Sequence, residues 1–214
     1  MLSRFFITGT DTGVGKTVVS ALFCAAFDAL YWKPIQTGIR EGSDRSTVMK
    51  LAQIPLTRTI PEVYTFGPPV SPHLAARLAN VRIELTKIRV PEIIRSNAQE
   101  SLIIEGAGGA LVPINRTQCM TDLMRQLTFP VLLVSRTALG TINHTLLSLA
   151  ALRASHLRVR GVIMVGAPNV ENRKAIEHYG EIEVLGTLPL LKKINRRKLL
   201  QAFRQNFSRK AFAT

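Results

Sequence analysis

The stretch that most constrains the fold is GTDTGVGKT at residues 9–17, which directly follows the apolar run RFFIT at residues 4–8. A glycine-rich loop between a buried strand and a helix can turn its backbone N–H groups inward, where they cradle phosphate oxygens. The standard phosphate-binding loop reads G-x-x-x-x-G-K-[ST], and here the first glycine stands one residue early, at Gly9. The strand before the loop and its GKT ending nevertheless predict a nucleoside triphosphate site.

Two side chains of this loop have predicted chemical roles. Lys16 is expected to reach the β- and γ-phosphate oxygens, and the hydroxyl of Thr17 to bind Mg²⁺. Glycines alone are a weak signal because they also form ordinary turns, but GKT at the start of a helix after a buried strand is far more specific. The loop residues expected to hold the nucleotide are Gly13, Val14, Gly15, Lys16, Thr17 and Val18.

Apolar strands and helices alternate along the rest of the chain. Several of the expected strands are continuous apolar runs, which is typical of strands buried on both faces of a parallel sheet. Strands are expected at residues 4–8, 30–34, 101–106, 130–135, 159–166 and 183–189. Helices are expected at residues 15–29, 84–98, 121–127, 141–155 and 170–179, and others beginning near Asp44 and Ser71. This order predicts a single α/β domain over residues 1–214, with a three-layer, P-loop NTPase-like fold in which helices cover both faces of a mainly parallel sheet.

The composition supports one large core and indicates no membrane or secretory address. Apolar residues make up 46% of the 214 residues and charged residues 20%, a balance typical of globular domains. The N-terminal segment MLSRFFITGT has no long apolar region and no small-residue cleavage site. Because the only cysteines are Cys24 and Cys119, we expect no disulfide framework, and a cytoplasmic protein that does not contact membranes.

The charge of the chain is strongly basic and unevenly placed. The formal net charge is +14, and from residue 192 onward there are eight basic residues and no acidic one. We expect a basic C-terminal helix or tail from about residue 192, which either binds polyanions or forms a solvated face. Since no helix-turn-helix, zinc spacing or aromatic stacking pattern accompanies these charges, nucleic acid is not expected as a partner.

Charged side chains are expected at the carboxyl ends of the strands, where ligands bind in open parallel sheets. Lys33 stands near the end of the short strand expected at residues 30–34, just before Pro34. With Lys16, it is placed to flank the γ-phosphate. Glu105 ends the apolar run LIIE, where a carboxylate is costly unless it has a cation partner. Asp44 is a further oxygen donor, although it is also a good helix cap. Since Mg²⁺ prefers hard oxygen ligands, the predicted metal ligands are Thr17, Asp44 and Glu105.

Two further segments offer backbone N–H groups to anions. The glycine-rich turn after Glu105 lets the backbone approach a ligand closely. The residues expected on the nucleotide there are Glu105, Gly106, Ala107 and Gly108, and Gly109 is expected on the substrate. A helix beginning after the strand at residues 130–135 presents its N-terminus, which suits an anion. The residues expected there are Gly140, Thr141, Ile142 and Asn143.

Taken together, these segments resemble one family of ATP-dependent enzymes, the dethiobiotin synthetases, whose phosphate loop reads G-T-D-T-x-V/I-G-K-T. The resemblance runs from about residue 4 to residue 190 and includes further blocks in the family's order. These blocks are YWKPIQTG at residues 31–38, SPH at 71–73, EGAGGALVP at 105–113, LGTINHTLLS at 139–148 and LGTLP at 185–189. The combination is highly specific, whereas the phosphate loop alone is not.

The resemblance implies an ATP- and Mg²⁺-dependent cyclo-ligase of biotin biosynthesis that forms C–N bonds. Such enzymes join CO₂ to 7,8-diaminononanoate and close a ureido ring, giving dethiobiotin, ADP and phosphate. This chemistry implies catalytic roles for Lys16, Lys33 and Thr12, and a substrate contact for Thr37. In the family, the start of the helix at residues 141–155 receives the substrate carboxylate from the neighbouring subunit. A homodimer with shared active sites is therefore expected.

One departure from the family and three rival functions remain open. Val165 stands where the family commonly has an asparagine that reads the purine base, and Asn169 is the candidate to replace it. A partition-type P-loop ATPase that binds DNA through its basic tail would need a second loop lysine, which Asp11 replaces. A related amide-forming ligase of cobalamin-type pathways would need a glutaminase domain, for which 214 residues leave no room. An inactive scaffolding homologue would have no reason to retain the lysines and the carboxylate described above.

Overall fold

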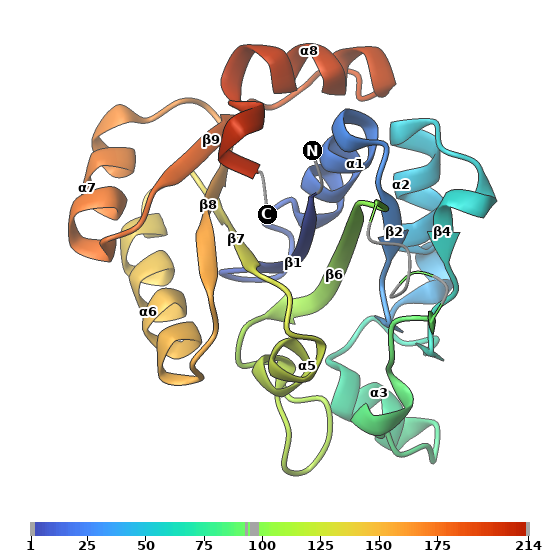
Figure 1. The fold of residues 1–214 in the computed structure, drawn as a ribbon. Helices are drawn as coiled ribbons and strands as arrows, with labels where there is room; N and C mark the ends of the chain where they lie inside the picture. Colours follow the sequence, from blue (N-terminus) through green and yellow to red (C-terminus); the bar gives the residue numbers. More distant parts are fainter. Residues whose placement is uncertain (1–2, 93, 95–98, 213–214) are drawn as a thin grey trace.

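A computed structural model describes residues 3–92, 94 and 99–212 (Figure 1). At its centre is a seven-stranded sheet in the order β4-β2-β6-β1-β7-β8-β9, in which every pairing between neighbouring strands is parallel. Parallel neighbours need a crossover connection, which a helix commonly supplies. The strands are β1 (Arg4–Gly9), β2 (Leu30–Trp32), β4 (Thr59–Ile60), β6 (Leu102–Gly109), β7 (Val131–Arg136), β8 (Val159–Val165) and β9 (Val184–Leu188).

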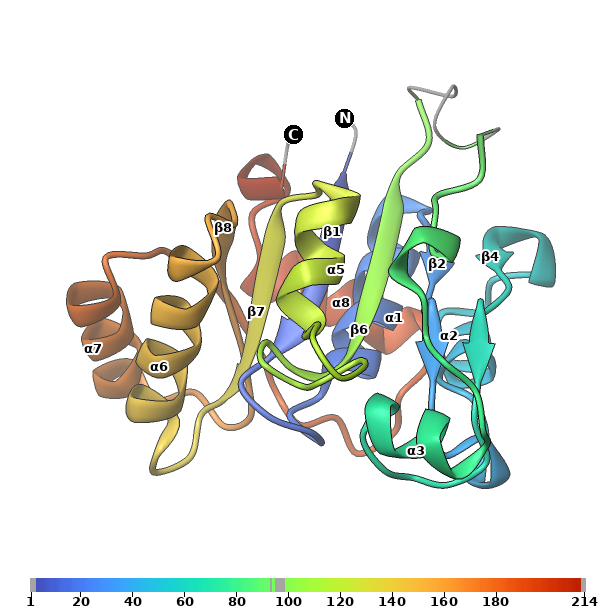
Figure 2. The ribbon, with the colours of Figure 1, turned by 90° about the horizontal axis from the view of Figure 1, so that it is seen from below.

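Helices cover both faces of this sheet (Figures 1 and 2). The buried side chains of each group of helices form a hydrophobic cluster with one face of the strands. The first group is α1 (Lys16–Phe27), α2 (Asp44–Ala52) and α8 (Arg196–Asn206). The second group is α3 (Pro72–Leu78), α5 (Met120–Leu127), α6 (Thr141–Ala154) and α7 (Val170–Gly180). The predicted three-layer α/β fold with a mainly parallel sheet is confirmed.

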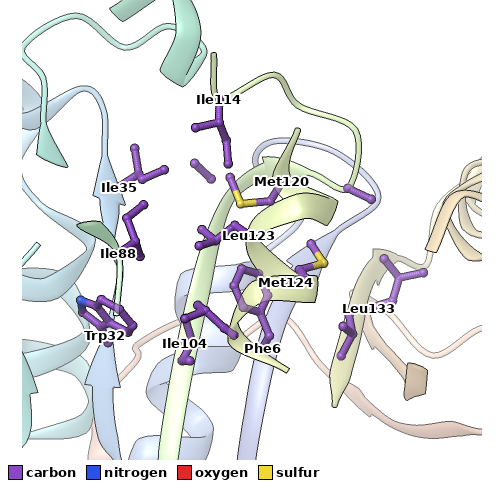
Figure 3. Close-up of a cluster of buried hydrophobic side chains, with 14 of the residues drawn as sticks. Phe6, Trp32, Ile35, Ile88, Ile104, Ile114, Met120, Leu123, Met124 and Leu133 are labelled. Carbon is purple, nitrogen blue, oxygen red and sulfur yellow. The ribbon is translucent and has the colours of Figure 1, made fainter. Parts of the chain in front are cut away.

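The strands are apolar on both sides because each side faces a layer of helices. Phe5 and Phe6 of β1 are both fully buried, but Phe5 belongs to the cluster that includes α1 and Phe6 to the cluster that includes α5. Ile103 and Ile104 of β6 divide in the same way. Figure 3 shows Phe6 and Ile104 beside Leu123 of α5. This two-sided burial explains why the strands read as continuous apolar runs.

A second sheet of two strands follows β2 in the chain. It pairs β3 (Ile35–Gln36) with β5 (Tyr64–Thr65) in parallel. The side chain of Gln36 is buried, and its Oε1 accepts a hydrogen bond of 3.0 Å from the backbone N–H of Asp44. The small sheet therefore holds the first residue of α2 in place.

A helix was expected over residues 84–98. For residues 84–91 this prediction is wrong. Only a 3-10 turn forms, at Leu85–Lys87, and the chain then runs to Pro91 without regular structure. Ile88 and Val90 are buried in the core, and extended backbone lets both side chains reach it. Pro91 also disfavours helical backbone at the residue before it. Residues 93 and 95–98 lie outside the described residues.

The basic C-terminal segment contains a helix, α8, that packs against α1. Leu199, Ala202 and Phe203 of α8 are buried. Phe212, in the 3-10 turn Arg209–Phe212 that follows, is fully buried against the ring of Phe23. The basic residues of this segment that remain exposed are Lys192, Lys193, Arg197, Lys198, Arg204, Arg209 and Lys210. Among the described residues, no helix is both long and apolar enough to span a bilayer.

Replacing Phe212 by alanine is expected to lower the free energy of unfolding by about 3–5 kcal/mol, because a buried ring is lost and a cavity is left behind. Phe212 is 0% exposed and contacts five other phenylalanine rings. Urea unfolding followed by circular dichroism measures the change. The control is Leu190→Ala, at a residue that is 78% exposed, which should change stability by less than about 0.5 kcal/mol. Equal effects of the two substitutions would contradict the anchoring role of Phe212.

Candidate active site

The carboxyl ends of β1, β2 and β6 open onto one pocket with a volume of about 650 Å³. Because β6 lies between β2 and β1 in the sheet, the segments that follow these strands are neighbours. The pocket is also lined by the start of α2 and by the loop before α3. The predicted site residues in its lining are Thr12, Gly13, Gly15, Lys16, Thr17, Val18, Lys33, Thr37, Asp44, Glu105, Ala107 and Gly108.

The unusual glycine spacing of the phosphate loop has a packing reason. A Cβ atom at Gly9 would lie 2.7 Å from Val14 Cγ2 and 3.1 Å from Lys16 Nζ, so Gly9 leaves room for the loop to fold back over the end of β1. Gly15 has a φ of 101°, in the left-handed region that favours glycine. The Lys16 ammonium donates a 2.9 Å hydrogen bond to the carbonyl of Asp11, which holds this side chain inside the loop.

Glu105 is the centre of the polar network beneath the loop. It is only 1% exposed, and both of its carboxylate oxygens accept hydrogen bonds. Oε1 accepts from Thr17 Oγ1 at 2.9 Å and from Lys33 Nζ at 3.3 Å. Oε2 accepts from Ser20 Oγ at 2.8 Å and from the Tyr31 hydroxyl at 3.0 Å. These four donors offset the large cost of burying a carboxylate.

Asp44 extends this network from the start of α2. The helix cap is Ser43, whose hydroxyl oxygen accepts a 3.0 Å hydrogen bond from the backbone N–H of Ser46. The Asp44 carboxylate is therefore available to the pocket. Its Oδ1 accepts from Thr17 Oγ1 at 2.8 Å, and its Oδ2 from Lys33 Nζ at 2.5 Å.

The three predicted metal ligands lie together. The Thr17 hydroxyl is within hydrogen-bond distance of the carboxylates of both Asp44 and Glu105, but its single proton serves only one of them at a time. A hard divalent cation would satisfy all three oxygens, so the donor set fits Mg²⁺. In the described part of the chain, no group of three or more His, Cys, Asp or Glu side chains is arranged to hold a metal ion. A divalent cation at this place would therefore be held by two carboxylates and one hydroxyl.

The two lysines have different electrostatic surroundings. Burial lowers the pKa of Lys33, but the carboxylates of Glu105 and Asp44 outweigh burial, so its pKa lies above the usual value. Burial raises the pKa of Asp44, yet the Lys33 ammonium outweighs burial and holds that pKa below its usual value. Burial lowers the pKa of Lys16 to about 8, an effect that Glu105 opposes and Lys33 reinforces. The Lys33 charge is therefore already compensated by carboxylates, whereas a bound anion would stabilise the Lys16 charge.

Two residues of the network were missed in the sequence, although each has a spacing that points to it. Ser20 stands four residues after Lys16 in α1, and so on the same face of the helix. Tyr31 stands two residues before Lys33, and side chains two apart share one face of an extended chain. Desolvation by burial raises the pKa of Tyr31 well above its usual value, and Glu105 adds to this effect. The Tyr31 hydroxyl therefore keeps its proton and acts as a donor.

Several predicted residues lie outside the pocket lining. Val14 is buried against Gly9. A Cβ atom at Gly106 would lie 2.8 Å from the Phe6 ring, so this glycine allows β6 to pack closely with β1. The others are Gly109 at the end of β6, and Gly140, Thr141, Ile142 and Asn143 at the start of α6.

Of the two residues considered for base recognition, Val165 lies next to the phosphate loop. Val165 at the end of β8 packs against the loop, with Cγ1 3.1 Å from the position of a Cβ at Gly15. Asn169 is the N-cap of α7, and its Oδ1 accepts a 2.9 Å hydrogen bond from the backbone N–H of Asn172. The acceptor oxygen of Asn169 is thus already engaged, and its role in base recognition stays a prediction.

Comparison with known proteins identifies close relatives over nearly the whole chain. A family model described as an AAA domain matches residues 3–198. The chain is 46% identical over 208 residues to the ATP-dependent dethiobiotin synthetase BioD of Nitrobacter hamburgensis, covering 97% of this chain and 96% of the relative. It is 43% identical over 212 residues to the protein of that name from Novosphingobium aromaticivorans, covering 99% and 100%. Identity to the Brucella melitensis biotype 2 protein of that name is 45% over 213 residues, covering 100% and 98%.

Solved structures show the same fold at low sequence identity. A ParA family ATPase from Chlorobium tepidum superposes with a TM-score of 0.54 at 14% identity, covering 96% of this chain and 91% of that chain. The MinD cell division protein of Aquifex aeolicus gives a TM-score of 0.52 at 16% identity, covering 94% and 87%. The predicted P-loop NTPase-like fold is confirmed, and at this identity the likeness concerns the fold alone.

The lowered pKa of Lys16 predicts that the affinity for ADP falls as pH rises through about 8. Below that pH the ammonium is present in the free protein, and above it the protein must take up a proton to bind the phosphates, so the dissociation constant should rise about tenfold per pH unit. Calorimetric titrations of Mg²⁺-free ADP between about pH 7 and pH 9.5 measure this. The Lys16→Arg variant is the control, because a guanidinium stays charged over this range. If the affinity of the unaltered protein for ADP did not change with pH, Lys16 would not be the group that binds the phosphates with a lowered pKa.

Proposed function

The chain belongs to the family of ATP-dependent dethiobiotin synthetases, and we propose that the pocket beneath its phosphate loop carries the family's reaction. Like those relatives, the chain is an ATP-dependent ligase that forms C–N bonds. Its substrates are ATP, CO₂ and 7,8-diaminononanoate, and its product is dethiobiotin, in the pathway to biotin. The observation that carries this conclusion is 43–46% identity over nearly the full length of such enzymes. The meeting of Lys16, Lys33 and Glu105 in one network supports it.

The reaction places a large negative charge in the pocket, and the two lysines are suited to neutralise it. One amine of the substrate takes up CO₂ and loses a proton, giving a carbamate. A carbamate oxygen then attacks the γ-phosphorus and ADP leaves, which produces a carbamic–phosphoric anhydride. The second amine attacks the carbonyl carbon and loses a proton, the bond from that carbon to the phosphate oxygen breaks, and the ring closes as phosphate leaves. Positioning and charge neutralisation dominate such phosphoryl transfers, and Lys16 and Lys33 line the pocket in which the carbamate and the γ-phosphate must meet.

The hydroxyls and backbone of the pocket are proposed to orient the reactants. Thr12 at the tip of the phosphate loop and Thr37 after β3 both line the pocket, and their hydroxyls can bind the carbamate or the diamine. The loop residues Gly13 and Gly15 place backbone N–H groups toward the triphosphate. Gly108 lets the turn after β6 approach the ligands closely.

We propose that Mg²⁺ binds at Thr17, Asp44 and Glu105. When bound there, the ion would supply positive charge that offsets the negative charge of the phosphates. In the protein itself, the carboxylates of Asp44 and Glu105 both contact Lys33, and their oxygens are hard donors of the kind that Mg²⁺ prefers. We also propose a cytoplasmic location, which the free thiols of Cys24 and Cys119 support.

The rival function, a partition-type ATPase that binds DNA, is supported only at the level of the fold. The ParA family ATPase shares 14% of its aligned residues with this chain, and one fold hosts many chemistries. Asp11 occupies the loop position at which that class needs a lysine. The ligase is therefore the function that the site supports best.

Lys16→Ala and Lys33→Ala should each lower the turnover number at least about a hundredfold, because each removes a cation from the transferring phosphoryl group. The assay combines purified protein with diamine, bicarbonate, Mg²⁺ and ATP, and detects the cyclic urea by mass spectrometry. Lys192→Ala, at an exposed residue of the C-terminal segment, is the matched control and should turn over normally. Product formation by a lysine variant at the unaltered rate would remove that residue from the mechanism, and no product from the unaltered protein would refute the proposed function.

We further propose a homodimer with shared active sites. The start of α6 offers a helix N-terminus suited to a carboxylate, but it lies outside the pocket lining of its own chain. Leu139, just before it, is fully exposed, and Leu147 within α6 is 62% exposed. A second subunit that covers these side chains would bring its α6 to the pocket of the first.

Mixing two inactive variants tests this arrangement. Lys33→Ala removes a cation from the pocket that holds the phosphates. Asn143→Asp adds a negative charge at the start of α6, which should repel the substrate carboxylate. If sites are shared, half of randomly mixed dimers are heterodimers with one intact site of two, so activity should return to about a quarter of the unaltered value. Light scattering should give the mass of two chains. A monomer, or activity no higher than the sum of the two variants, would contradict shared sites.

A further inference from the structure

The carboxylate of Glu105 has one oxygen that faces the pocket and one that does not. Oε1 lies within hydrogen-bond distance of Thr17 and Lys33, both of which line the pocket. Oε2 is held instead by the hydroxyls of Ser20, at 2.8 Å, and Tyr31, at 3.0 Å. Ser20 and Tyr31 are 0% exposed and neither lines the pocket. Neither hydroxyl can therefore act by touching a ligand in the pocket.

The fold brings the two hydroxyls to Glu105 from different elements. Tyr31 of β2 pairs in register with Ile103 of β6, and Glu105 follows Ile103 by two residues, so all three side chains lie on the face covered by α1. The Tyr31 ring runs along this face, and its hydroxyl reaches the level of Glu105. Ser20 reaches the same oxygen from α1, one turn after Lys16.

We propose that Ser20 and Tyr31 are positioning residues that fix the Glu105 carboxylate, so that Oε1 is presented to the divalent cation and to Lys33. A carboxylate on a glutamate side chain can rotate about its terminal bond, and burial alone does not select one orientation. Two hydroxyl donors on Oε2 select it, because any rotation would leave a buried charged oxygen without partners. This inference rests on the proposed metal site, and it is independent of which substrate the enzyme carboxylates.

The proposal makes a specific prediction about cation binding. Partners that orient a metal ligand commonly contribute a factor of about 10–100 to metal affinity. Tyr31→Phe keeps the ring and removes only the hydroxyl, and Ser20→Ala removes the other donor. Each variant should weaken Mn²⁺ binding to the protein with a non-hydrolysable ATP analogue about tenfold, and the double variant should weaken it further. Affinity for the Mg²⁺-free nucleotide should stay within about twofold, since the phosphate loop is unchanged.

Electron paramagnetic resonance of free Mn²⁺ measures the dissociation constant directly, without any turnover. The matched control is Tyr64→Phe, which also removes a phenol hydroxyl that is hydrogen-bonded to the backbone, at Glu84. Tyr64 is not in the pocket lining, so its variant should bind Mn²⁺ normally even if its melting temperature falls. Thermal melting of every variant separates loss of stability from loss of cation binding.

The outcomes decide the proposal. Weakened Mn²⁺ binding by Tyr31→Phe and Ser20→Ala, with normal binding by Tyr64→Phe, supports it. Unchanged Mn²⁺ binding in folded Tyr31→Phe and Ser20→Ala proteins, or equal weakening by Tyr64→Phe, overturns it. Failure of the unaltered protein to bind Mn²⁺ with the nucleotide also overturns it, together with the metal site. If the unaltered protein binds Mn²⁺ but forms no cyclic urea, the proposed function fails while this inference stands or falls on the variants.

Discussion

The buried negative charge of Glu105 is the constraint on which the arrangement of the site depends. An isolated carboxylate in a protein interior costs several kcal/mol, and removing one partner from a buried charge pair is strongly destabilising. Here the partners come from three different elements: Thr17 and Ser20 from α1, Tyr31 from β2, and Lys33 from the chain just after β2. Satisfying this one group thus requires α1 to be seated on the sheet and β2 to be in register with β6. The contacts that stabilise the buried Glu105 carboxylate therefore also shape the pocket.

Lys16 and Lys33 differ in how far their positive charges are compensated, because their hydrogen-bond partners differ. Lys33 is tied to two carboxylates, so its charge is compensated before any ligand arrives. Within the described residues, Lys16 donates a hydrogen bond to the Asp11 carbonyl alone, and burial lowers its pKa to about 8. An incoming polyphosphate would therefore stabilise the Lys16 charge most. A divalent cation held at Asp44 and Glu105 would share these oxygens with Lys33, so the charge of this ammonium would be less fully compensated.

Much of this site could be predicted from sequence because its residues follow strands directly. Lys33 and Glu105 end apolar runs, and a charge in that place has few purposes other than a ligand or a buried pair. Ser20 and Tyr31 share a face with Lys16 and Lys33, but their common partner, Glu105, is far away in the sequence. The contact of Tyr31 also depends on the register of β2 with β6, which a single sequence does not specify. The expected helix over residues 84–98 was wrong for residues 84–91, because apolar spacing there fits both a helix and a buried extended segment. The helix N-terminus at the start of α6 suggested an anion site, and family resemblance suggested that the anion is a substrate carboxylate. This role stays a prediction, because Asn143 does not line the pocket.

Position 11 of the phosphate loop shows how proteins of one fold can differ in a single charged residue. The ParA family and MinD proteins share the architecture at 14–16% identity, and partition-type members place a lysine where this chain has Asp11. A lysine there would put a third ammonium next to the Lys16 charge, which the Asp11 carbonyl and the nearby carboxylates now hold. With an aspartate, the loop instead closes on itself, since the Asp11 carboxylate accepts a hydrogen bond from the backbone N–H of Thr12 at 2.6 Å. This contact joins adjacent residues of one chain, so Asp11 takes part in the local structure of the loop and adds no positive charge next to Lys16.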